Sequence, residues 1–128
     1  MILSFPWRPL AEVNPSRPYV ALLGVVRLSS IRILPTFLRY GVRIERQLRR
    51  TPGVLAYRTG AEPLNLTFYH LSAWADAAAL QEFVETVPHR LAVERLSGRL
   101  GETSFRYWTV SGIDLPMSFQ HELHRIGA

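Results

Sequence analysis

Hydrophobic and polar positions follow two different periods along this chain, and the changes of period divide it into elements. An unbroken apolar run from Tyr19 to Leu28 is rich in β-branched residues, as expected of a strand buried on both faces. Between Ile33 and Arg50 the apolar residues recur at spacings of three and four, which is typical of one face of a helix. The helix is expected to end at Thr51-Pro52-Gly53.

The second half of the chain alternates with period two and then turns helical. Val54–Thr59 predicts a short strand, and a tight turn separates it from a long strand over Leu64–Trp74, so the two form an antiparallel hairpin. Asp76 is the predicted N-cap of a second helix, which Pro88 interrupts because proline lacks the backbone donor. A last strand is predicted over Thr103–Ser111.

This β-α-β-β-α-β order predicts an α+β, ferredoxin-like domain over residues 19–111. Its four-stranded antiparallel sheet carries both helices on one face. The other face is too apolar for water, so we expect a second copy of the chain, or the chain's own ends, to cover it. Those ends are a proline-rich arm at residues 1–18 and a tail at residues 112–128, with a short helix predicted over Ser118–Arg125.

Composition narrows the class of protein. With 128 residues, the chain is expected to form one domain with one core. The absence of cysteine excludes disulfides, thiolate metal sites and cysteine nucleophiles, and favours a cytoplasmic protein. The first residues lack the basic start of a secretion signal, and no apolar run approaches the roughly 20 residues of a membrane span. We therefore expect no membrane partner.

All 15 basic residues are arginine, and the net charge is +5. An anion-binding surface and the codon usage of a GC-rich genome both explain this bias, and the glutamates interspersed among the arginines favour the second explanation. The last strand, TSFRYWTVS, lacks the aromatic motif of RNA-recognition sheets. We expect no nucleic-acid partner, although an anionic ligand at the arginine-rich first helix stays open as an alternative.

Two histidines are the candidate catalytic residues. His70 shares a strand face with Phe68 and Trp74, and His89 follows the helix break at Pro88. A neutral imidazole there could take a proton from an activated phenol or enol, or bind iron. The competing interpretations are a satisfied core residue for His70 and an ordinary surface residue for His89.

Aromatic side chains on these elements are the candidates for binding a flat apolar substrate, with core packing as the alternative for each. They are Trp74, Phe68, Tyr69, Tyr107 and Phe83. His121 and His124 have helical spacing, but a third ligand of fixed spacing is lacking, so we expect no metal site.

Together, these residues resemble the antibiotic-biosynthesis-monooxygenase-like proteins. The matching pattern runs from the strand end to the helix break: Trp74, Asp76, Leu80, Phe83, Pro88, His89 and Arg90. The resemblance covers residues 19–111. It implies a homodimeric α+β barrel in which each copy binds substrate between its sheet and helices.

The resemblance also implies alternatives for the chemistry. Some members oxygenate polycyclic aromatic substrates without a cofactor, whereas the heme-degrading and spheroidene-monooxygenase-like branches bind heme through a histidine. By position, His89 is the candidate base or heme ligand, and Trp74 the candidate cavity wall. We expect a monooxygenase acting on an apolar aromatic or polyene, secondary-metabolite-like substrate, with either no cofactor or heme. A non-oxidative cyclase or dehydratase on the same scaffold, and a non-catalytic binding or dimerisation module, stay open.

Overall fold

A computed structural model of the chain describes residues 2–86 and 89–125, and the side chains of residues 89–91 and 125 lie outside that description. The elements, in chain order, are β1 (Leu3–Ser4), β2 (Arg8–Pro9), β3 (Pro18–Leu28), α1 (Leu34–Arg50), β4 (Val54–Glu62), β5 (Thr67–Trp74), α2 (Ala77–Glu85), α3 (His89–Leu96), β6 (Leu100–Ser111) and α4 (Phe119–Arg125). Single turns of 3-10 helix lie at Ile31–Ile33, Pro63–Asn65 and Gly112–Asp114.

The four long strands form the antiparallel ferredoxin-like sheet that the sequence predicts, in the order β4-β5-β3-β6. The predicted number of four strands is wrong, because within the described residues the sheet has six. The arm adds two short strands to the outer edge of β4, where Leu3 pairs with Ala61 and Arg8 with Tyr57. An edge position suits this proline-rich segment, since prolines there interrupt no central hydrogen-bond ladder.

Several strand boundaries also differ from the prediction: β4 continues to Glu62 instead of ending at Thr59, and β6 begins at Leu100 instead of Thr103. The strand predicted from Leu64 begins instead at Thr67, because Pro63–Asn65 form a 3-10 turn and Leu66 adopts a left-handed conformation with φ of 50°. Leu64 is fully exposed. Leu64 and Leu66 lie at alternate positions, which resembles the start of a strand. Pro63 favours a turn at this point instead, and the turn determines the observed conformation.

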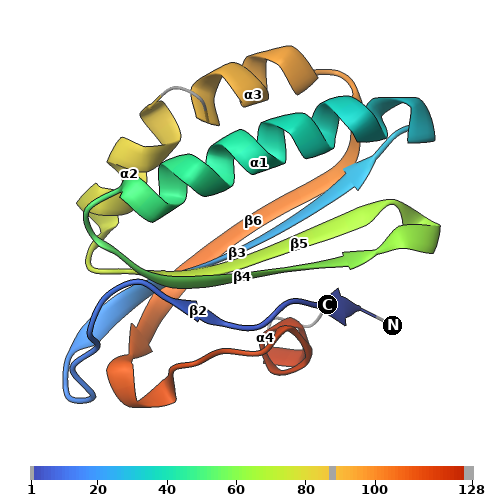
Figure 1. Ribbon diagram of the computed structural model, residues 1–128. Coiled ribbons are helices and arrows are strands. Elements are labelled where there is room, and N and C mark those ends of the chain that lie inside the picture. Colours follow the sequence, from blue (N-terminus) through green and yellow to red (C-terminus); the bar gives the residue numbers. More distant parts are fainter. Residues whose placement is uncertain (1, 87–88, 126–128) are drawn as a thin grey trace.

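The helices α1, α2 and α3 cover one face of the sheet, called here the helix face (Figure 1). The predicted first helix is confirmed as α1, and it ends before Gly53, whose φ of 90° suits glycine. Asp76 caps α2 as predicted, by accepting a 2.8 Å hydrogen bond from the backbone N–H of Ala79. The buried core between α1, α2 and the sheet consists of Leu48, Val54, Tyr57, Trp74, Leu80 and Phe83.

The opposite face is covered by the chain's own arm and tail, and α4 lies against it (Figure 1). Phe119 and Met117 of the tail are buried in its core, and Trp7 of the arm packs against them. The strand residues of this core are Tyr19, Ala21, Leu23, Leu55, Leu71, Ala73 and Val110. Of the two predicted covers, the structure shows the arm and tail. No described helix is long and apolar enough to cross a membrane.

Candidate active site on the helix face of the sheet

Strand β5 carries the candidate base His70 on the helix face of the sheet. Alternation along the strand turns Phe68 and Trp74 to the same face, and two ring contacts show this directly. Phe68 packs against Phe37 of α1 with ring centroids 4.6 Å apart, and Trp74 packs against Phe83 of α2 at 5.2 Å. His70 lies between these two contacts along the strand and is half-buried.

Two aromatic side chains of β6 share the helix face with His70, on the far side of β3. Gly24 of β3 pairs with His70 on one side and with Phe105 of β6 on the other, and the next row on this face ends at Tyr107. A Cβ at Gly24 would lie 2.8 Å from the Phe105 ring and 3.9 Å from the Cβ of His70. The absence of a side chain at Gly24 therefore lets the Phe105 ring extend across β3 toward His70.

Phe105 and Tyr107 are exposed to solvent, although the helix face around Trp74 is buried. Phe105 has 58% of its surface exposed and Tyr107 has 73%. The helix face is thus open at β6, so His70 lies at the boundary between a packed core and an accessible aromatic surface.

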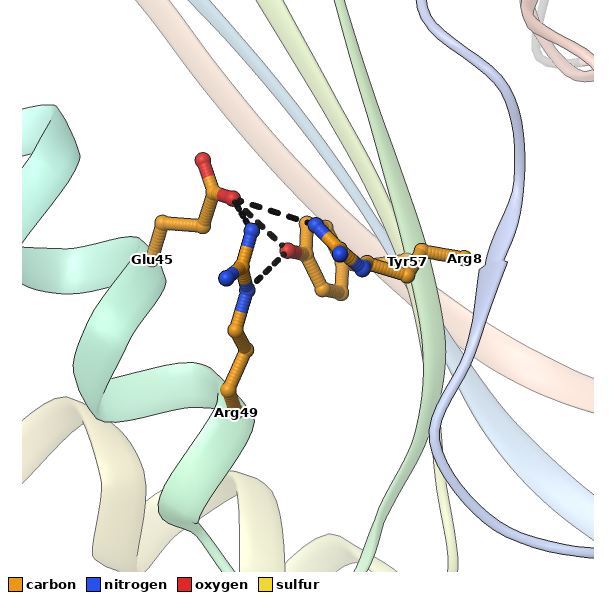
Figure 2. Close-up of polar contacts among 4 residues, drawn as sticks. All are labelled: Arg8, Glu45, Arg49 and Tyr57. Carbon is orange, nitrogen blue, oxygen red and sulfur yellow. Dashed lines mark hydrogen bonds and ion pairs between the residues drawn. The ribbon is translucent and has the colours of Figure 1, made fainter.

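A buried tyrosine connects His70 to α1. Tyr57 of β4 is 4% exposed, and its ring is nearly parallel to that of His70, with centroids 6.4 Å apart. Its hydroxyl donates to Glu45 at 2.9 Å and accepts from Nε of Arg49 at 3.1 Å (Figure 2). Nη1 of Arg8, in the arm, lies 3.8 Å from the same Glu45 oxygen. The network joins three elements and fixes the Tyr57 ring beside His70.

The hydrogen bonds of this network favour the charged form of Arg49. The hydrogen bond to the Tyr57 hydroxyl raises the pKa of Arg49 above its ordinary value, and the carboxylate of Glu45 adds to the rise. Sequence reasoning did not select this network. The spacing of Glu45 and Arg49 is the one available signal, since residues four apart on a helix are neighbours.

Trp74 and Phe83 belong to the core next to His70. Trp74 is fully buried, and its Nε1 donates a 2.8 Å hydrogen bond to Oγ of Ser72. Phe83 is 5% exposed. The Trp74 and Phe83 rings are therefore inaccessible to a ligand, whereas Phe68 and His70 are half-buried and Tyr107 is exposed.

Tyr69 lies on the opposite face, so the sheet separates it from the other candidates. Its hydroxyl donates to Glu62 at 2.6 Å, and its ring packs against Phe119 of α4 at 5.7 Å. Burial and this hydrogen bond raise the pKa of Tyr69 to about 12, and the same hydrogen bond lowers the pKa of Glu62.

His89 is the first residue of α3, but its side chain and the whole of Pro88 lie outside the described residues. Its predicted roles as base or heme ligand stay predictions. Elsewhere, Nε2 of His121 lies 3.8 Å from the carboxylate of Glu122 in α4. Across the described ranges, no group of three or more His, Cys, Asp or Glu residues could hold a metal ion.

Two open grooves lie away from His70. One, of about 480 Å³, runs between β6 and the tail and is lined by Arg58, Trp108, Met117 and His121 among others. The other, of about 500 Å³, runs between α1 and α2. His70 lines neither groove, so the enclosed cavity that the resemblance implies does not correspond to either of them.

Comparison with known proteins identifies the fold. No family model and no curated protein matches the chain. Among solved structures, a candidate monooxygenase from Lactobacillus acidophilus is 15% identical with a TM-score of 0.66, over 83% of this chain and 51% of that protein. SnoaB, a cofactor-independent oxygenase from Streptomyces nogalater, is 13% identical with a TM-score of 0.60, over 72% and 92%. An antibiotic biosynthesis monooxygenase is 15% identical with a TM-score of 0.63, over 70% and 95%.

These similarities confirm, at the level of fold, the predicted resemblance to antibiotic-biosynthesis-monooxygenase-like proteins. The chain spans about half the length of the Lactobacillus protein. Because a fold hosts many activities, the function has to be argued from the site itself.

Proposed function

We propose that the protein is a small monooxygenase that oxidises a flat, apolar aromatic or polyene substrate over the helix face. The observation that supports this most directly is the position of His70, half-buried on the face that also carries the exposed rings of Phe105 and Tyr107. An aromatic surface next to an imidazole suits proton abstraction from an apolar acid. The shared fold with a cofactor-independent oxygenase supports the oxidative form of this chemistry.

The reaction that fits is the oxidation of an activated methylene, flanked by a phenol or a carbonyl, to a ketone. His70 accepts one proton from the methylene, and the resulting carbanion reduces dioxygen and forms a carbon–oxygen bond. When the O–O bond breaks, one oxygen atom stays on the substrate as the carbonyl. The second carbon-bound hydrogen leaves as a proton, and with the proton that His70 returns it completes one molecule of water. The substrate supplies all four electrons, so no external reductant is required.

Other residues position the reacting groups. Phe68, Phe105 and Tyr107 would contact the substrate ring by stacking or edge contacts. Tyr57 is a positioning residue, because its ring lies parallel to the imidazole and its hydroxyl is held by Glu45 and Arg49. Trp74 and Phe83 support the site from the core.

The heme-dependent alternative places the macrocycle beside Trp74, with His89 as the axial ligand. Trp74 is fully buried under Phe83, so the residues present do not leave an accessible surface at that position for the macrocycle. No step is therefore derived through heme. A hemin titration with His89→Ala alongside tests this alternative separately, since a saturable Soret band lost in the variant would establish the ligand.

The principal test follows oxygen uptake and product mass with a panel of polycyclic phenols and anthrones. His70→Gln keeps the side-chain size but removes the base, so we expect kcat to fall by about 10²–10⁴-fold with KM changed far less. Tyr69→Phe, on the opposite face, is the matched control and keeps the wild-type rate. Full activity in His70→Gln would refute the assigned base.

Two other outcomes of this assay point to the alternative functions. Substrate turnover without oxygen uptake identifies a cyclase or dehydratase on the same face. Saturable ligand binding without any turnover identifies a non-catalytic binding module.

We further propose that the protein acts as a homodimer in which a second copy adjoins β6. The arm and tail already occupy the face opposite the helices, and β6 is the long edge strand with exposed aromatic side chains. Sedimentation analysis of the wild type and Tyr107→Arg measures this directly. A monomeric wild type at micromolar concentrations contradicts the proposal.

A further inference from the structure

The groove between α1 and α2 is chemically distinct from the rest of the helix layer. Three arginines of α1 line one side, and the groove has a volume of about 500 Å³. Its lining residues are Arg43, Arg46, Gln47, Arg50, Thr51, Pro52, Glu82, Phe83 and Thr86. His70 and the aromatic residues of β6 are absent from this lining, so the groove is separate from the proposed active site.

The three arginines share one side of α1 because they follow one another at spacings of three and four. Arg50 lies in the last turn, where a cation offsets the negative end of the helix dipole. Arg43 and Arg46 lie further back, so the dipole does not account for them. Their position along one groove is what needs an explanation.

These arginines are not used in ion pairs between described residues, in contrast to Arg49 and Arg8, which both lie close to Glu45. Arg43 packs its guanidinium over the Tyr40 ring, with the guanidinium carbon 5.7 Å from the ring centroid. For Arg46 and Arg50, no carboxylate of the described chain lies within 4.0 Å. Guanidinium groups in this state retain their capacity for bidentate hydrogen bonds to an oxyanion.

The net charge of the lining residues indicates the charge that a suitable ligand should carry. Three arginines face one carboxylate, that of Glu82 on α2, which leaves an excess of two positive charges. A phosphate monoester carries about 1.5 to 2 negative charges at pH 7, and its oxygens match the arginine fork. A monocarboxylate would neutralise only half of the excess.

One hydrogen bond joins the two walls of the groove, and two others lie within the walls. Nε2 of Gln47 donates to the backbone carbonyl of Phe83 at 3.2 Å, which ties α1 to α2 across the floor. The hydroxyls of Thr51 and Thr86 bond to backbone carbonyls of their own helices at 2.7 Å each. The arginines therefore line a cleft whose two walls are joined at Gln47, and the exposed ring of Pro52 is its accessible apolar group.

We infer that the arginine groove between α1 and α2 is a binding site for a small molecule that carries a phosphate or diphosphate group. The inference rests on Arg43, Arg46 and Arg50 and is independent of the chemistry at His70. Nucleic-acid phosphates share the same chemistry, but one short groove between two helices suits a small molecule better than an extended strand.

The test is a titration of ¹⁵N-labelled protein with inorganic pyrophosphate at an ionic strength of about 0.15 M, followed through the arginine Nε–Hε resonances. We expect saturable shifts at Arg43, Arg46 and Arg50. Arg46→Gln should weaken binding by about tenfold, since it removes a charge-assisted hydrogen bond.

Arg39→Gln is the matched control, because it removes the same charge about two turns earlier on the same helix and outside the groove lining. It should change the affinity less than about twofold. Equal weakening by both variants would show diffuse attraction and overturn the site, as would the absence of saturable shifts. A short RNA oligonucleotide that binds more tightly than pyrophosphate, with shifts spread beyond the groove, would overturn the small-molecule assignment.

Discussion

The two faces of the sheet are covered by different parts of the chain and to different degrees. On the arm-and-tail face, Ala21, Leu23, Leu71 and Ala73 are all essentially inaccessible to solvent. On the helix face, the residues next to them in sequence on β3 and β5 are buried less uniformly: Val20, Leu22 and His70 are half-buried, whereas Gly24, Ser72 and Trp74 are buried.

The difference shows where a ligand could be accommodated. The central rows of the arm-and-tail face have their packing completed by the chain's own ends, so they contribute stability, and the open groove on this face lies between β6 and the tail. The helix face is packed around Trp74 and between Phe68 and Phe37, and it is open at β6, where Phe105 and Tyr107 are exposed. An incompletely covered apolar surface beside a histidine is the feature expected of a binding site.

The largest expected effect comes from a matched pair of phenylalanine truncations. Phe119→Ala, in the arm-and-tail core, should lower the free energy of unfolding by about 3–5 kcal/mol, because the ring is 3% exposed. Phe105→Ala, on the open helix face, should change it by only about 0.5 kcal/mol. Urea denaturation measures both. Similar losses in the two variants would mean that the faces are equally packed in solution.

An intermediate effect is expected at Gly24. Gly24→Ala places a Cβ 2.8 Å from the Phe105 ring, so the ring must move away from His70 at a cost of about 1–3 kcal/mol. Combining it with Phe105→Ala should remove most of that cost, because the clashing ring is then absent. The double-mutant cycle is read from unfolding free energies, and full additivity would show that the two residues do not touch.

The smallest effect is a pH dependence on the closed face. The pKa of Tyr69 is raised to about 12 from an ordinary value of 10.0, so the native state keeps this proton longer than the unfolded chain does. Its contribution to stability is complete below pH 10 and is lost as the pH rises to about 12. Tyr69→Phe should flatten that part of the stability profile. Urea midpoints at several alkaline pH values measure it, with Tyr107→Phe on the open face as the control.

Much of the fold follows from the spacing of apolar residues and from the turn and capping residues between the elements. The helix α1 is encoded by apolar spacing and ends as predicted before Gly53, and Asp76 caps α2 because its carboxylate can accept a backbone N–H. The two short arm strands could not be predicted, since pairing of Leu3 with Ala61 depends on contacts far apart in sequence. Leu64 and Leu66 show how turn residues override an apparent alternation.

The candidate site was predictable only in part. Period two correctly put His70 and Phe68 on one face, and it already put Tyr69 on the other. The approach of Phe105 to His70 was not visible, because it depends on the register of β6 against Gly24. The stacking of Tyr57 on His70 depends in the same way on the pairing of β4 with β5.

The helix α4 follows every strand of the sheet in sequence, and this affects how the protein is synthesised. Until Met117 and Phe119 have left the ribosome, the tail does not cover the apolar strand residues that include Leu23 and Leu71. The nascent sheet therefore exposes aggregation-prone surface until α4 has emerged. Truncation or late ribosome stalling upstream of α4 should yield a chain with complete strands that is a chaperone client instead of a native protein.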